Sequence, residues 1–99
     1  MLKLKDARLQ VAIELQQWNR GRSGPEEFVI LDEHTIERPW GWVFFYTTRG
    51  WLDGDDRYIV AGNGPFIVNC HSGVIRAMTT AQSIEHQIAE YEVTLANDA

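Results

Sequence analysis

Two stretches near the ends of the chain repeat apolar residues at the spacing of an α-helix. In residues 4–19 an apolar residue recurs every three or four positions, namely at Leu4, Ala7, Val11, Leu15 and Trp18. Glycine and proline in residues 21–25 end this stretch. Residues 81–95 repeat the pattern with Ile84, Ile88, Tyr91 and Leu95, and Thr80 stands where an N-cap is expected. The pattern predicts an N-terminal and a C-terminal helix.

Short β-forming runs, separated by turn residues, fill the chain between the two helices. Strands are predicted over residues 28–37 and 42–49. Two further strands, Phe66–Cys70 and Val74–Thr79, flank His71-Ser72-Gly73 and predict a β-hairpin in which Gly73 takes a positive φ.

Residues between the second strand and the hairpin leave two interpretations open. Tyr58–Ala61 is either an edge strand or the approach to the turn Gly62-Asn63-Gly64-Pro65. Because Gly and Asn tolerate the left-handed region, at least one of residues 62–64 is expected at positive φ. The turn lacks the lysine and the following helix of a phosphate-binding loop, so turn geometry explains it.

The order helix, antiparallel meander, helix predicts an α+β fold with one domain over residues 1–99 and a structured core over about residues 4–95. We expect an antiparallel sheet of four to five strands with both helices packed on one face. From Trp42 to Tyr46 the chain is apolar at both parities. Such a strand is either central and covered on both sides, or it uses one face for a partner. The side chains expected in the core are Leu15, Trp18, Phe44, Tyr46, Ile67, Ile84, Ile88 and Tyr91.

Composition and charge narrow the classes of function. Nine Lys and Arg against 14 Asp and Glu give a net charge of −5, which disfavours binding to nucleic acid or an anionic membrane and suits a basic partner. The longest apolar run, residues 40–46, is far shorter than the ~20 residues of a membrane helix. Charged residues from Lys3 to Arg8 occupy the place of a signal-peptide apolar region, so we expect a soluble protein of the cytoplasm.

Few residues suggest catalysis or metal binding. The single cysteine, Cys70, excludes an internal disulfide and a cysteine-rich zinc site. Its neighbour His71 would point to the opposite face of a strand, and no third orienting residue stands out, so neither residue is expected to do chemistry. The three histidines have no metal-site spacing, and we expect no metal and no cofactor.

The densest acidic segment of the chain is Asp53-Gly54-Asp55-Asp56, directly after Trp51. It departs from a calcium loop in its glycine position and its missing twelfth acidic residue. A solvated loop is one interpretation, and a partner-binding patch of Trp51, Asp53, Asp55 and Asp56 is the other, because an exposed Trp beside carboxylates is typical of a contact hot spot. Trp51 could equally be a core residue that closes the loop.

Several of these segments together resemble the immunity protein 35 family of small bacterial proteins, over about residues 4–95. The stretch Gly41–Tyr46 with its Trp42-x-Phe44-x-Tyr46 pattern, the downstream turn at Gly62-Asn63-x-Pro65, Gly73 and the closing helix carry the resemblance. It implies a protein of a polymorphic toxin system that neutralises a toxin made by the same cell. It supplies no catalytic motif; the matched positions imply architectural roles, and they are Trp42, Phe44, Tyr46, Gly62, Asn63, Pro65 and Gly73.

The expected function is therefore binding and stoichiometric neutralisation of a cognate protein toxin domain, without enzymatic turnover. One alternative is a holdase-like folding helper, if one apolar face of the Trp42–Tyr46 strand is exposed. A Cys70-dependent enzyme is the other alternative.

Overall fold

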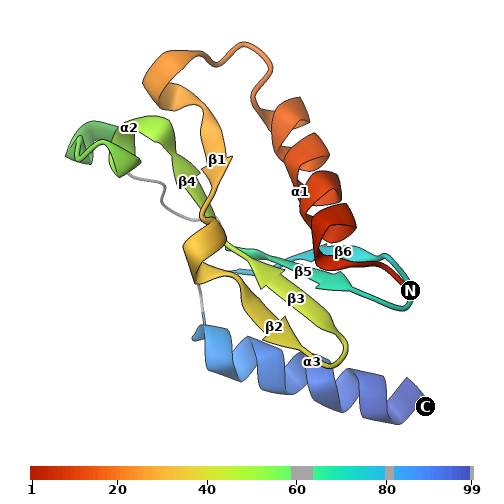
Figure 1. Cartoon of the computed structure of the whole chain (residues 1–99). Helices are drawn as coiled ribbons and strands as arrows, with labels where there is room; N and C mark the ends of the chain where they lie inside the picture. The colour runs from red at the N-terminus through yellow and green to blue at the C-terminus, as the bar shows by residue number, and fades with distance from the viewer. Residues whose placement is uncertain (59–63, 80–81, 99) are drawn as a thin grey trace.

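The chain has an α+β fold, described here from a computed structural model that places residues 1–58, 64–79 and 82–98 (Figure 1). A helix lies near each end, and short strands with single turns of helix lie between them. In chain order the elements are α1 (Leu4–Trp18), η1 (Gly24–Glu26), β1 (Phe28–Ile30), η2 (Asp32–His34), β2 (Ile36–Arg38), β3 (Gly41–Phe44), β4 (Tyr46–Thr48), α2 (Arg49–Leu52), η3 (Asp56–Tyr58), β5 (Phe66–Asn69), β6 (Ile75–Ala77) and α3 (Ile84–Asp98).

The strands form two antiparallel sheets, one of four strands in the order β2-β3-β5-β6 and one of two strands, β1-β4. The strand predicted over 42–49 is therefore divided at Phe45, and the strand predicted over 28–37 is divided by η2. The reason lies in the register. Between the pairs Ile30–Tyr46 and Ile36–Val43, residues 31–35 lie opposite only residues 44 and 45. The surplus residues coil into η2, and the ribbon bends into two sheets.

The two long helices cover opposite faces of the four-stranded sheet, which corrects the expectation that they share one face. Alternation along β3 is the cause, because neighbouring side chains of a strand point to opposite faces. Trp42 and Phe44 pack with Val11 of α1, while Val43 packs with Ile88 of α3. Of the two interpretations of the doubly apolar strand, the structure shows the central one, covered on both sides.

Most of the predicted core residues lie inside the two apolar clusters. Tyr46 and Ile84 are half-buried. Trp18 was wrongly predicted as mostly buried: it is 37% exposed, because it sits at the last turn of α1 and covers the edge of the aromatic group of Phe28, Tyr46 and Phe66. The fully confirmed members are Leu15, Phe44, Ile67, Ile88 and Tyr91.

The C-terminal helix starts later than predicted, at Ile84 instead of residue 81. The hydroxyl of Ser83 accepts a hydrogen bond from the His86 N–H at 3.1 Å, which is the geometry of an N-cap. Thr80, the predicted cap, lies outside the described residues.

The hairpin around residues 71–73 is confirmed, and Gly73 has a φ of 74°. The prediction for the turn before β5 falls partly on Gly62 and Asn63, which lie outside the described residues. Gly64 is within the described residues, and its small size is required there because a Cβ on Gly64 would clash with the carbonyl oxygen of Met78. Residues 59–61 of the ambiguous segment are likewise outside the described residues, and Tyr58 ends η3.

Candidate partner-binding surface

The molecule is elongated and measures 43 × 27 × 22 Å. The predicted patch lies at one end of it, in a tip formed by α2 and η3 (Figure 1). Thr48 starts α2, because its hydroxyl accepts a hydrogen bond from the Trp51 N–H at 3.2 Å. Gly50 is buried, and a Cβ there would clash with the ring of Tyr58 and with Pro25. The close fit holds the tip against the segment that leads into β1.

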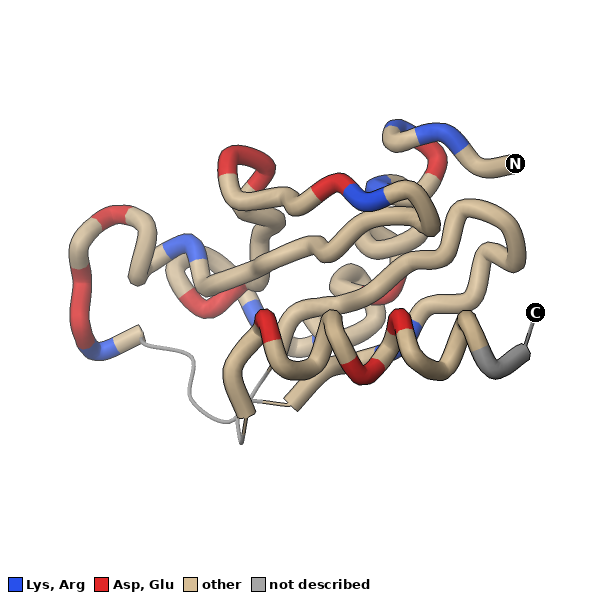
Figure 2. The backbone as a smooth tube through the Cα atoms, turned by 90° about the horizontal axis from the view of Figure 1, so that it is seen from below, with Lys and Arg blue, Asp and Glu red and all other residues tan. Residues whose placement is uncertain are grey.

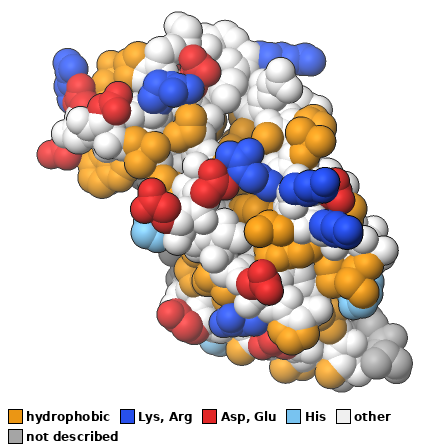
Figure 3. Space-filling view, in the orientation of Figure 1, with side chains coloured by type: hydrophobic (Ala, Val, Ile, Leu, Met, Phe, Trp, Pro, Cys, Tyr) orange, Lys and Arg blue, Asp and Glu red, His pale blue; other side chains and the backbone are white. Residues whose placement is uncertain are grey.

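Trp51 is exposed on this tip, with 40% of its surface accessible, and it belongs to neither core cluster. The interpretation of Trp51 as a core residue is therefore not supported. Leu52 beside it is 54% exposed. Sequence reasoning missed Leu52, although an apolar residue next to a candidate anchor is a signal that could have been used. Figure 3 shows apolar, acidic and basic side chains together over this end, at the upper left.

The three aspartates of the tip have different environments. Asp55 is held by Arg57 in a two-pronged ion pair, with 2.7 Å between Oδ2 and the guanidinium nitrogen Nη2. Hydrogen bonds from Arg57 lower the pKa of Asp55 below its usual range. Asp53 and Asp56 are exposed and have no ion-pair partner among the residues that the structure describes. In Figure 2 this end of the chain projects at the left, where red Asp and Glu segments are followed by a blue Lys or Arg segment.

Consequently the tip presents two apolar side chains and two free carboxylates on one short loop, while the third carboxylate stabilises the loop. Asp55 was predicted as a contact residue, and its geometry gives it a part in loop structure as well. A rigid aromatic side chain loses little entropy on binding, and with free carboxylates beside it Trp51 is suited to contact a protein surface that carries basic groups.

The positions that the family resemblance marked as architectural lie in the interior or in a turn where they are described, and Gly73 is the partly buried one in the hairpin turn. Trp42 and Phe44 are buried in the cluster under α1, and Pro65 is buried at the start of β5. Tyr46 is half-buried in the aromatic group next to them.

Comparison with known proteins identifies the family. The model of the family described as Immunity protein 35 matches residues 5–92 of the chain.

The chain belongs to the immunity protein 35 family.

The Escherichia coli (strain K12) protein YrhB, described as uncharacterized, is 39% identical over 57 residues, which are 57% of this chain and 61% of YrhB. The chain thus spans about three fifths of that relative's length. No solved structure matches the chain.

Membership of the immunity protein 35 family points to a non-enzymatic role. Cys70 is buried with its Sγ 3.7 Å from the Pro39 carbonyl oxygen, whereas His71 is exposed and its backbone N–H donates to the Asn69 side chain. Within the described residues no three His, Cys, Asp or Glu side chains gather as a metal site. None of the described helices combines the length and the apolar character needed to cross a bilayer.

Proposed function

We propose that this immunity protein 35 family member binds a cognate toxin domain directly through the α2–η3 tip and blocks it stoichiometrically, without turnover. The toxin belongs to a polymorphic toxin system of the same bacterium, and the complex forms in the cytoplasm. The observation that carries the proposal is the exposed Trp51 on a firmly held loop with two free carboxylates beside it.

The charge of the tip supports a basic partner. Asp53 and Asp56 are free to attract cationic groups, and long-range attraction between opposite charges raises the rate of encounter. Trp51 and Leu52 then supply the apolar contact that slows dissociation once the partner is seated.

Binding kinetics of the purified pair test this proposal, with the toxin domain encoded beside the gene as the ligand. Trp51→Ala should weaken binding by about 2 kcal/mol or more, which is roughly 30-fold in Kd. The matched control is Val93→Ala, because Val93 is 61% exposed on α3, away from the tip, and its truncation should leave Kd unchanged.

A double variant Asp53→Asn, Asp56→Asn should slow association at low salt and change dissociation little, since exposed charges act mainly on the encounter. Asp55→Asn is measured separately, with its melting temperature, because it also breaks the pair with Arg57. Survival of toxin-expressing cells is followed in parallel. Unchanged affinity of the Trp51→Ala and aspartate variants would remove the tip from the proposal, and absence of any complex with the toxin domain would remove the immunity function.

The holdase alternative rested on an exposed face of the Trp42–Tyr46 strand. The two helices bury Trp42, Val43 and Phe44, so the folded protein does not expose the apolar strand face that the holdase alternative requires.

A further inference from the structure

The outer edge of β6 is a second surface that can accept a protein chain. The pairing of β6 with β5 fixes which backbone groups face inward. The Asn69 N–H donates to the Val74 carbonyl at 3.1 Å, and the Met78 N–H donates to the Pro65 carbonyl at 2.8 Å. In an antiparallel pair such hydrogen-bonded positions alternate with positions whose N–H and C=O point the other way.

The backbone groups that point away from β5 are consequently those of Ile75 and Ala77. β6 is the last strand of its sheet, and no described strand pairs with this edge. Ala77 is exposed. A free edge of this kind is a template for one more strand.

Two residues further along the same edge, at Thr79, a side chain of the protein occupies the place of such a strand. The side-chain amide of Gln87 accepts from the Thr79 N–H at 2.9 Å and donates to the Thr79 carbonyl at 2.8 Å. These two bonds are the pair that a neighbouring strand would make. The amide of Gln87 thereby closes one end of the edge and leaves the stretch at Ile75 and Ala77 open.

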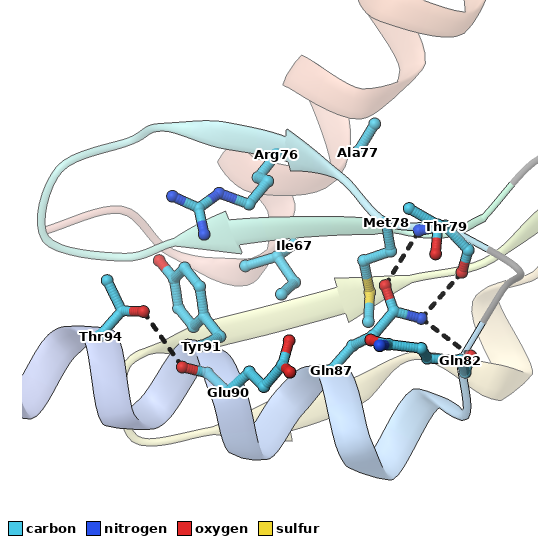
Figure 4. A pocket seen from close by; sticks show the side chains of 10 residues that line it. All are labelled: Ile67, Arg76, Ala77, Met78, Thr79, Gln82, Gln87, Glu90, Tyr91 and Thr94. Carbon is cyan, nitrogen blue, oxygen red and sulfur yellow. Dashed lines mark hydrogen bonds between the residues drawn. The ribbon is translucent and has the colours of Figure 1, made fainter.

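A groove of about 240 Å³ runs between β6 and α3 beside this open stretch (Figure 4). Its floor is apolar and includes Ile67, Met78 and Tyr91. The guanidinium of Arg76 lies 5.3 Å from the centre of the Tyr91 ring and forms a polar rim with Glu90. Alternate side chains of an added strand point to the α3 face, so one of them would enter the groove.

We propose that the β6 edge binds an extended segment of the protein partner as a fifth strand, with an apolar side chain of that segment in the groove beside α3. The identity of the partner as the toxin domain rests on the proposed function. The β6 edge would give that partner a second contact, separate in sequence from the tip. A second copy of this chain is disfavoured in the register that pairs Ile75 with Ala77, because Arg76 would then lie directly opposite the Arg76 of the other copy, and like charges in that position are destabilising.

The test compares a substitution at the edge with a control outside it, and the purified toxin domain is the probe. Ala77→Pro removes the outward N–H while leaving the bonds between β5 and β6 in place, as proline is tolerated on an edge strand. It should weaken binding at least tenfold. The control Val93→Ala truncates an exposed side chain of α3 that does not line the groove, so its Kd should stay within threefold of the parent.

Residue-resolved hydrogen exchange of the unsubstituted complex gives a second readout that does not depend on how the proline variant folds. The amides of Ile75 and Ala77 should exchange more slowly in the complex than in the free protein. A complex in which both amides exchange at the free rate would overturn the fifth-strand proposal and leave the proposed function standing. Absence of a complex would overturn both. Slowing of the same amides with rising concentration of the protein alone would show that a second copy occupies the edge, which also contradicts the proposal.

Discussion

The hydroxyl of Tyr46 is a buried polar group without a hydrogen-bond partner among the described residues. The Tyr46 ring belongs to the aromatic group and stacks on the Phe66 ring, with 5.4 Å between the two ring centroids. An unsatisfied buried hydroxyl costs about 1–3 kcal/mol, whereas its removal without change of shape costs little. Tyr46→Phe should therefore keep or raise the free energy of unfolding, measured by urea denaturation. A clear loss of stability would show that the hydroxyl has a partner in solution.

The same hydroxyl makes the stability depend on alkaline pH. Burial raises the pKa of Tyr46 from 10.0 to about 12. The unfolded chain then loses its proton first, so the folded state is favoured below pH 10 and loses that advantage as the pH rises from 10 to about 12. The slope of the unfolding free energy in this range should be smaller in Tyr46→Phe. Parallel curves for the two proteins would contradict the assignment.

Gly64 gives a prediction of the opposite sign. A Cβ at this position meets the carbonyl group of Met78, which is backbone and cannot rotate away. Gly64→Ala should destabilise the protein by about 1–3 kcal/mol, the usual cost of forcing extra volume into a packed site. A thermal melt measures it, and an unchanged melting temperature would show that β6 yields at this point without loss.

At the scale of elements, Asn19 does for β1 what Gln87 does for the end of β6. Its side-chain oxygen accepts from the Phe28 N–H at 2.7 Å, and its nitrogen donates to the Phe28 carbonyl at 3.2 Å. Asn19→Ala should destabilise by about 1–3 kcal/mol, because it leaves two part-buried backbone groups unsatisfied. Asn19→Asp retains the hydrogen-bond acceptor but not the donor. Its free energy of unfolding, measured by urea denaturation, should therefore lie between those of the parent protein and Asn19→Ala. Equal stability of all three would mean that water replaces the amide.

The helices could be predicted from the sequence because their signal is local: apolar residues at the right period and a glycine-rich end. The strand divisions could not, because they follow from a surplus of residues in η2 that is visible only once β1 and β2 have found their partners. Placing α1 and α3 on opposite faces was within reach, since the double apolar pattern of Trp42–Phe44 allowed it. At the tip, the sequence singled out Trp51 and the aspartates as a candidate patch, but it did not predict the ion pair of Asp55 with Arg57, which depends on the local loop geometry.

At the scale of the molecule, one sheet separates two apolar clusters, and each depends on its own helix. Ile88→Asp places a charge beneath α3 and should lower the free energy of unfolding by several kcal/mol, roughly 3–5. It should also expose the Val43 and Ile67 face, which binding of a fluorescent apolar dye detects. Val93→Asp on the outer side of α3 is the control and should change neither. Normal stability of Ile88→Asp would show that α3 contributes little to the fold.

The buried position of the single cysteine allows local opening of the protein to be measured by thiol labelling. Cys70 is 5% exposed in the cluster under α1, and its carbonyl accepts a hydrogen bond from the Leu2 N–H at 2.8 Å. A thiol reagent can reach the sulfur only when this layer lifts away from the sheet. Labelling rates recorded along a denaturant series therefore separate a partial opening of the N-terminal layer, which varies weakly with denaturant, from complete unfolding, which varies steeply. The experiment uses the native cysteine, so no substitution is needed, and labelling is timed from the addition of the reagent.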